Sequence, residues 1–275
     1  MNNNAIISLT DESAPFREYS PDNMEIIEAE IDIAGASVRL QISVEDKPAR
    51  LSDIVPLARA ISDKLCQAIL NHPAGSGQTV QCQKGCSNCC SYLVPLSMPE
   101  VFRLREELSA MGEDFASCVL NTSLACKEKI LDIHAFQKLH INDHYEISEI
   151  SRWYAELRLP CPFLSKGLCS IYRQRPLACR EHMVTSPSSL CKSSALNFPE
   201  TVEMPVSVLE ALGQLAAEFE KSEVEAVILP LALAGLEDGP DRSQRTWPAI
   251  RLVERFVDIV KTTARKHAAK PQLLV

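Results

Sequence analysis

The spacing of apolar and polar residues changes several times along the chain, and each change marks a predicted element. Residues 24–45 alternate with a period of two around Gly35, which predicts a β-hairpin because successive side chains of a strand point to opposite faces. From residue 51 onward, apolar residues recur at helical spacing, with Ser52 as a candidate N-cap. The segment 71–77, which contains glycine and proline, ends this predicted helix.

Helical spacing describes most of the remaining chain, with one long interruption. Ser97 followed by Pro99 marks the start of a second predicted helix. The interruption lies at residues 159–192, where cysteine, proline, glycine and arginine accumulate. The other predicted helices cover residues 114–139, 145–158, 205–221, 223–236 and, after a loop at 237–248, a final amphipathic stretch that ends near residue 266.

Charge and apolar run length restrict the partners that the chain can have. Its 275 residues carry a formal net charge of −8, which argues against a broad phosphate-binding face, so we expect no nucleic-acid partner. The N-terminus lacks the basic and apolar regions of a secretory signal. The longest apolar run, 226–236, is too short to span a bilayer. We therefore expect a cytoplasmic protein without membrane contact.

Eleven cysteines are present, and eight of them gather in two polar segments. Structural disulfides are disfavoured in the cytosol, so these thiols need another explanation. The other three, Cys66, Cys118 and Cys126, lie on predicted helices among apolar neighbours, and we expect them to pack like small hydrophobic residues. The clustered cysteines are Cys82, Cys86, Cys89 and Cys90 in the first segment and Cys161, Cys169, Cys179 and Cys191 in the second.

These eight thiols are candidate metal ligands. Thiolates are soft donors that select Zn²⁺, Cu(I) or iron–sulfur clusters over hard cations. The vicinal pair Cys89–Cys90 restricts the geometry, because adjacent side chains diverge and would be strained if both bound one metal ion. The sequence therefore allows two mononuclear sites or one cluster with spare cysteines. Because eight thiols with a vicinal pair fit a lone structural zinc poorly, iron–sulfur is favoured over zinc.

Two motifs carry a family resemblance. CQKGCSNCC at 82–90 and CPFLSKGLCSIYRQRPLACR at 161–180 resemble the signature of the YkgJ-type cysteine-cluster family, described as zinc- or iron-chelating proteins. The resemblance implies metal or cluster binding without a settled reaction. Cys191 lies outside the core pattern, so whether it and Cys90 both bind stays open. His182 stands where the family usually has a bulky apolar or aromatic residue, which leaves open whether its imidazole is a ligand.

Three neighbours of the thiols are predicted to contact the bound group. Arg175 and Arg180 flank Cys179, and their positive charges would offset the charge of about −2 that four thiolates leave around a divalent metal ion. Tyr172 is expected to pack over the site or to hydrogen-bond a sulfur. Lys84 is equally well explained as a surface cation beside a polar loop.

These observations define an expected architecture. We expect a mainly α fold, in which helices pack around two cysteine-rich metal-binding loops and a small N-terminal β-hairpin is attached. The predicted parts are a flexible segment 1–22, a hairpin plus helix 23–74, a cysteine-cluster metal-binding domain 75–195 and a C-terminal helical extension 196–275 packed on that domain.

The sequence is compatible with three functions. The first is a metal-binding protein that holds an iron–sulfur cluster or zinc, with no reaction and no protein partner assigned. The second is a cluster-dependent enzyme, because flagellin lysine N-methylases carry a similar cysteine pattern, although no G-x-G-x-x-G loop after a strand and no P-loop is found. The third is a thiol or cluster redox sensor that uses the C-S-N-C motif or the vicinal pair.

Overall fold

The computed structural model describes residues 6–9, 23–33, 35–71, 79–131, 147–192, 199–235 and 241–268. Within these ranges the chain forms eight α-helices and four antiparallel sheets, three of which have only two short strands. The expected mainly helical fold with an N-terminal hairpin is therefore confirmed. In the part of the chain that the structure describes, no helix has both the length and the apolar character needed to cross a membrane.

The hairpin consists of β2 (Met24–Ile33) and β3 (Ala36–Glu45), which pair along their whole length. Gly35 lies in the turn with a φ of +83°. The predicted alternation places the apolar side chains of both strands, such as Ile31 and Leu40, on the buried face. A third strand, β1 (Ile7–Leu9), pairs with β3 to give the sheet order β1-β3-β2. This strand lies within the segment 1–22 that the sequence predicts to be flexible.

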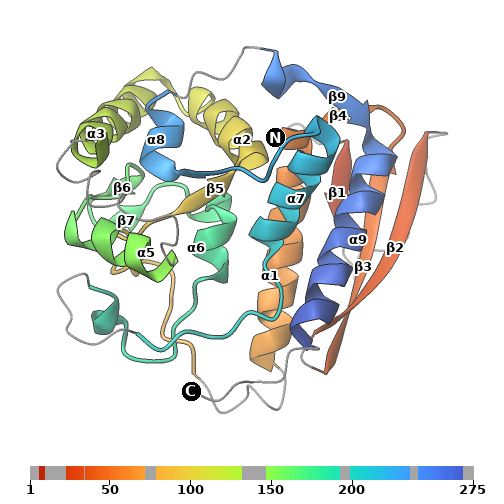
Figure 1. Ribbon diagram of the computed structural model, residues 1–275, viewed down its shortest axis with the longest axis horizontal. Coiled ribbons are helices and arrows are strands. Elements are labelled where there is room, and N and C mark those ends of the chain that lie inside the picture. The colour runs from red at the N-terminus through yellow and green to blue at the C-terminus, as the bar shows by residue number, and fades with distance from the viewer. Residues whose placement is uncertain are drawn as a thin grey trace.

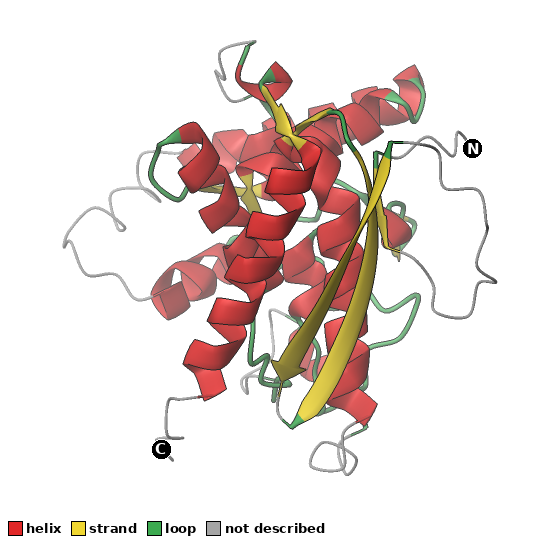
Figure 2. Ribbon diagram, turned by 90° about the vertical axis from the view of Figure 1, so that its right-hand side faces the viewer, coloured by secondary structure: helices red, strands yellow, loops and turns green. Residues whose placement is uncertain are grey.

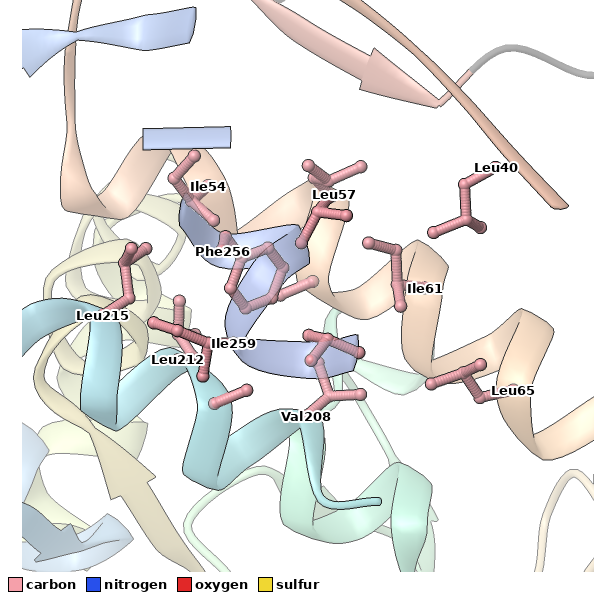
Figure 3. Packing of buried hydrophobic residues seen from close by; sticks show 14 of the residues in the cluster. Leu40, Ile54, Leu57, Ile61, Leu65, Val208, Leu212, Leu215, Phe256 and Ile259 are labelled. Atoms are coloured by element: carbon pink, nitrogen blue, oxygen red, sulfur yellow. The ribbon is translucent and has the colours of Figure 1, made fainter. Parts of the chain in front are cut away.

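Three helices pack behind this sheet (Figures 1 and 2). They are α1 (Val55–Asn71), α7 (Val208–Glu220) and α9 (Ala249–Ala268). Helices α1 and α9 contact the sheet, and α7 contacts both of these helices. Leu40, Ile61, Leu212 and Phe256 meet in one buried cluster, to which each of these elements contributes (Figure 3). The main core is thus shared by segments from both ends of the chain.

The start of α1 differs from the prediction. Residues Leu51–Ile54 form a 3-10 turn before the helix, and Ser52 is not its cap. The Ser52 hydroxyl instead donates a hydrogen bond to Glu106 (3.3 Å). Arg50 precedes the turn, and its guanidinium binds Asp53 (3.1 Å) and Glu106 (2.6 Å). The polar residues at this position therefore join the helix start to a neighbouring helix.

A second group of helices lies on the side of α1 and α7 away from the hairpin (Figure 1). It contains α2 (Met98–Ser109) and α3 (Glu113–Leu131). Ser97 and Pro99 begin α2 as predicted, with Pro99 in its first turn. The predicted helix 114–139 extends beyond the described residues after Leu131, and α5 (Ile147–Glu156) follows the segment that is not described.

Two predictions near the C-terminus are wrong in their element type. The expected helix 223–236 contains the strand β8 (Ala226–Ile228), which pairs with β5 (Pro95–Ser97) before α8 (Leu229–Leu233) begins. The expected loop 237–248 contains β9 (Thr246–Pro248). This strand pairs with β4 (Pro48–Arg50). In both cases a three-residue strand pairs with a distant segment of the chain.

The predicted division into four parts remains a prediction. The main core contains buried residues from positions 7–69, 177–216 and 249–264. A second cluster contains residues from α2, α3 and α8 together with Phe163 and Ile171 of the second cysteine segment. The cysteine segments therefore lie beside the second cluster, and Leu177 and Met183 attach them to the main core.

Candidate metal centre

The first cysteine segment consists of two successive turns. The Cys86 N–H donates to the carbonyl of Gln83 (3.0 Å), and the Cys90 N–H donates to the carbonyl of Ser87 (3.0 Å). Gly85 has a φ of +96°, a conformation that glycine adopts without strain, so it allows the first turn as its place before Cys86 suggests. The turns confine four thiols to nine residues of backbone.

The second cysteine segment contains several short elements. The strands β6 (Leu164–Ser165) and β7 (Leu168–Cys169) form a small hairpin just after Cys161. The short helix α6 (Leu177–Glu181) carries Cys179, and a 3-10 turn at Ser188–Cys191 ends at the last thiol. In Figure 1, β6, β7, α5 and α6 gather on the side of the molecule opposite the hairpin.

Hydrogen bonds join the two segments. The Cys161 N–H donates to the carbonyl of Cys90 (2.8 Å), and the Gln81 N–H donates to the carbonyl of Val184 (2.8 Å). The Asn88 side chain donates to the carbonyl of Ser188 (2.8 Å). The structure thus brings the two cysteine segments into contact, although 70 residues separate Cys90 from Cys161.

The thiols influence one another through their charges. Burial raises the pKa of Cys161 to about 11, and the neighbouring thiolates of Cys169 and Cys89 raise it as well. A hydrogen bond from the Cys90 thiol lowers the pKa of Cys89, and the same bond raises the pKa of Cys90. Of the two vicinal thiols, Cys89 is therefore the one that loses its proton more readily. Burial also raises the pKa of Cys179, followed by the charges of Cys161 and Cys89.

Arg175 lies near several of these thiols, and its role as a cation that offsets the charge of a bound group stays a prediction. Burial raises the pKa of Cys82 and Cys179, and the positive charge of Arg175 opposes this rise; after the hydrogen bond from Cys90, it also helps to lower the pKa of Cys89. The guanidinium stacks over the ring of Tyr172, with its central carbon 4.0 Å from the ring centroid. Tyr172 therefore holds this cation in place from one side. The Arg175 Nε is buried and has no hydrogen-bond partner among the described residues.

Arg180 has a different position from the one its sequence neighbours suggest. It is 8% exposed, and its Nη1 lies 2.6 Å from both carboxylate oxygens of Asp63 on α1. It also donates to the carbonyls of Arg175 (3.0 Å) and Arg173. Through these contacts, Arg180 connects the loop before α6 to α1. Its role as a neighbour of the bound group stays a prediction, and the geometry shows a positioning residue.

Glu100 is a site residue that sequence reasoning missed. Its carboxylate is fully buried and accepts hydrogen bonds from the N–H of Leu177 (2.8 Å) and from the N–H (3.2 Å) and hydroxyl (3.1 Å) of Ser97. Burial raises the pKa of Glu100, against the effect of these hydrogen bonds. Glu100 therefore joins the start of α2 to the start of α6. The available signal was its place three residues after the cap Ser97.

His182 lies at the edge of the site. Its ring meets Tyr92 edge to face, with 5.7 Å between centroids, and burial lowers its pKa. The pKa of Tyr92 is raised by burial and then by Cys191 and Cys89, so the aromatic pair lies beside these thiols. The His182 Nε2 is buried and finds no hydrogen-bond partner in the described residues. It is a neutral nitrogen with the chemistry of a metal ligand.

Of the three cysteines left out of the site, Cys126 lies beside Cys161, whose pKa it helps to raise, whereas Cys66 and Cys118 lie on α1 and α3. Cys66 is buried on α1, and its sulfur contacts the carbonyl of Arg180 at 3.8 Å. Cys126 is buried on α3, where its sulfur lies 3.8 Å from the carbonyl of Pro160. Cys118, also on α3, is exposed, although the sequence predicts a packed face there. Its exposure makes it a control for the clustered thiols.

Replacing Gly85 with alanine should destabilise the first turn. The added Cβ would meet only the Leu168 side chain, at an ordinary 3.8 Å, so the effect comes from backbone strain at a φ of +96°. A non-glycine residue in this region costs about 1 kcal/mol. Urea denaturation of the metal-free protein should show this loss for Gly85→Ala. The neighbouring change Lys84→Ala, at an exposed position, should leave the unfolding midpoint unaltered.

Replacing Glu100 with alanine should lower the free energy of unfolding by about 2 kcal/mol, because the buried Leu177 N–H would lose its acceptor. Chemical denaturation would measure this loss. Glu113→Ala, at the exposed start of α3, should change stability by less than about 0.5 kcal/mol. Equal effects of the two substitutions would show that the buried hydrogen bonds of Glu100 contribute nothing specific.

The protein is mainly helical, and its two cysteine segments together form a candidate centre for a soft metal ion. Residues 81–201 match the model of the CxxCxxCC family, described as "Putative zinc- or iron-chelating domain". This match confirms the resemblance that the two cysteine motifs indicate, for residues 81–201. No curated protein and no solved structure matches the chain.

Proposed function

We propose that this protein binds iron or zinc through the eight clustered thiols, with an iron–sulfur cluster as the favoured form. The observation that carries the proposal is the gathering of two distant cysteine segments by hydrogen bonds inside a stretch that matches a metal-chelating family. Thiolates are the ligands that these metals select. We infer the cytoplasm as the compartment, because a reducing environment keeps such thiols available for metal.

The side chains around the candidate centre have the chemistry that iron or zinc binding requires. Arg175 supplies positive charge next to Cys82, Cys89 and Cys179, where bound thiolates would accumulate negative charge. Among the described residues, no three histidine, cysteine, aspartate or glutamate side chains converge closely enough to hold a metal ion as they stand. Binding therefore involves rotation of cysteine side chains toward a common centre. Because the thiols must lose their protons, binding also strengthens as the pH rises.

The test is elemental analysis and a visible spectrum of protein purified without oxygen and without chelators. Iron and acid-labile sulfide in stoichiometric amounts, with visible absorption, would identify a cluster. Stoichiometric zinc in a colourless protein would identify a zinc centre. Cys118→Ala should retain the same metal content, because this thiol lies outside the cluster on α3. Protein that holds neither metal, and takes up neither on reconstitution, would refute the proposal.

The vicinal pair also favours a second candidate function, a thiol redox sensor. The pKa of Cys89 is lowered by the hydrogen bond from Cys90, so Cys89 is the reactive thiolate. Peroxide could oxidise the two thiols to a disulfide, with release of two water molecules for each peroxide consumed. An unchanged thiol count after mild peroxide treatment of the metal-free protein would exclude this function. For methyl transfer, binding of S-adenosylmethionine in calorimetry is the observation that would support an enzyme.

A further inference from the structure

The hydrogen bonds between the two cysteine segments fall into two separate sets. In one set, Gln81 and Cys82 lie along Val184: the Gln81 N–H donates to the Val184 carbonyl (2.8 Å), and the Val184 N–H donates to the Cys82 sulfur (3.4 Å). The Asn88 amide donates to the carbonyl (2.8 Å) and the hydroxyl (3.4 Å) of Ser188. Ser188 begins the 3-10 turn that ends at Cys191. This set brings the first segment to Cys191.

The other set brings the first segment to Cys161. The Cys161 N–H donates to the Cys90 carbonyl at 2.8 Å. Cys161 and Cys169 both pack against the second hydrophobic cluster, and the β6–β7 hairpin places Leu164 opposite Cys169. Cys191 does not belong to this cluster, and it lies on the other side of α6 in the sequence. The vicinal pair therefore stands between two groups of thiols that are held by different contacts.

The charges that act on the thiols follow the same division, except that Cys89 acts on both groups and Cys126, outside both, acts on Cys161. The pKa of Cys191 is raised first by burial and then by Cys89, Cys82 and Cys86. The pKa of Cys179 is raised first by burial and then by Cys161, Cys89 and Cys169, with Arg175 acting in the opposite direction.

The vicinal pair completes the division. For Cys90, the effects after its hydrogen bond to Cys89 and its burial come from Cys161, Cys89 and Cys169. Cys90 thus belongs with Cys161 and Cys169. Cys89, in contrast, helps to raise the pKa of Cys191 in one group and of Cys179 in the other. Because Cys90 is assigned to the Cys161 side, Cys89 is the fourth donor for the Cys191 side.

We propose that the eight thiols form two four-thiolate metal centres that meet at the Cys89–Cys90 pair. The outer centre consists of Cys82, Cys86, Cys89 and Cys191, and the inner centre consists of Cys90, Cys161, Cys169 and Cys179. Each set has the ligand number of a closed tetrahedral zinc site or of one iron–sulfur cluster. This inference rests on the proposed metal-binding function and specifies its stoichiometry and ligands.

The division gives each member of the vicinal pair a place. In the structure the Cys90 thiol hydrogen-bonds Cys89, so metal binding would turn the two adjacent side chains apart, one toward each proposed centre. The Arg175 charge acts on Cys82 and Cys89 of the outer centre and on Cys179 of the inner one, so this cation is near members of both sets. At that position it offsets charge from both sets of thiolates.

The test uses Zn²⁺ alone as the probe, with native mass spectrometry of the reduced full-length protein under anaerobic conditions. Wild-type protein should bind two zinc ions per chain. Cys82→Ser and Cys169→Ser should each retain one zinc ion, and the double variant should retain none. Cys118→Ser should keep both, because its thiol is exposed on α3 outside both sets.

Paired substitutions test the assignment of the vicinal cysteines. Cys89→Ser combined with Cys82→Ser should still hold one zinc ion, since both changes affect the outer centre. Cys89→Ser combined with Cys169→Ser should hold none. The reverse pattern would overturn the assignment of Cys89 and Cys90. If wild-type protein bound a single zinc ion that either single substitution abolished, the two-centre proposal would be wrong while metal binding itself would stand. Wild-type protein that binds no zinc or iron would refute the proposed function as well.

A measurement on wild-type protein covers the case in which a variant does not fold. Zinc would be titrated from zero to three equivalents, and the protection of each cysteine from alkylation would be followed by peptide mapping. Protection of the eight cysteines that saturates at two equivalents supports two centres. Separate protection curves for the outer four and the inner four support the membership as well. Saturation of all eight curves at one equivalent would overturn the proposal.

Discussion

Cys179→Ala should release the metal of the proposed inner centre and strongly lower the stability of the metal-loaded protein. Cys179 lies on α6, the helix that Glu100 and Arg180 attach to the rest of the structure, and we propose its thiolate as a ligand. A ligand that binds only the folded state stabilises it by about 4 kcal/mol when its free concentration is a thousandfold above the Kd. Losing the metal should therefore remove about this amount.

Measurements with and without metal separate the contribution of metal binding to stability from that of side-chain packing. Metal content and thermal unfolding would be measured for wild type and Cys179→Ala, each with and without a chelator. The difference between the two proteins should be large with metal and small without it, because replacing one thiol group with hydrogen changes the packing only slightly. Cys118→Ala should match wild type in both states. An equal loss with and without metal would assign Cys179 to packing alone.

Arg180→Ala should lower the free energy of unfolding by about 3 kcal/mol even without metal. The substitution would leave the carbonyls of Arg175 and Arg173 without their charged donor, and hydrogen bonds to charged groups contribute about 1.5 to 3 kcal/mol each. The ion pair itself contributes less, because the Asp63 side chain is 59% exposed. Urea denaturation of the chelated protein would measure the loss.

Two controls identify the origin of that loss. Asp63→Asn should lower stability by less than about 1 kcal/mol, since it removes only the half-exposed partner. Arg255→Ala, which breaks an exposed ion pair with Glu218, should have a similarly small effect. If Asp63→Asn were as destabilising as Arg180→Ala, the ion pair rather than the carbonyl contacts would hold the loop.

Local patterns predicted the elements whose cause is local. The hairpin follows from a two-residue alternation that continues over both long strands, and α2 follows from the Ser97 and Pro99 signals at its start. The sequence pattern predicts helix for Ala226–Ile228, because this short apolar run continues directly into the residues of α8. Its pairing with Pro95–Ser97 depends on a segment 130 residues away, which no local pattern reveals.

The candidate centre shows the same limit. Cysteine spacing and the two motifs identified the eight thiols, and the family match supports that reading of the segments. Spacing could not show that Asn88 joins Ser188 or that Arg180 joins Asp63, because each pair lies 100 or more residues apart. It also could not divide the thiols into groups. That division depends on backbone contacts at Val184 and Cys90, which exist only after the chain has folded.

The shared main core also determines the order of events during synthesis. Phe256 and its neighbours on α9 complete the core that begins with β2, β3 and α1, so this core cannot close until the last helix has left the ribosome. The thiols between residues 82 and 191 are synthesised well before that moment. Long-range closure of this kind is slow compared with local folding. The cysteine segments therefore attach, through Leu177 and Met183, to a core that is complete only after α9 has packed.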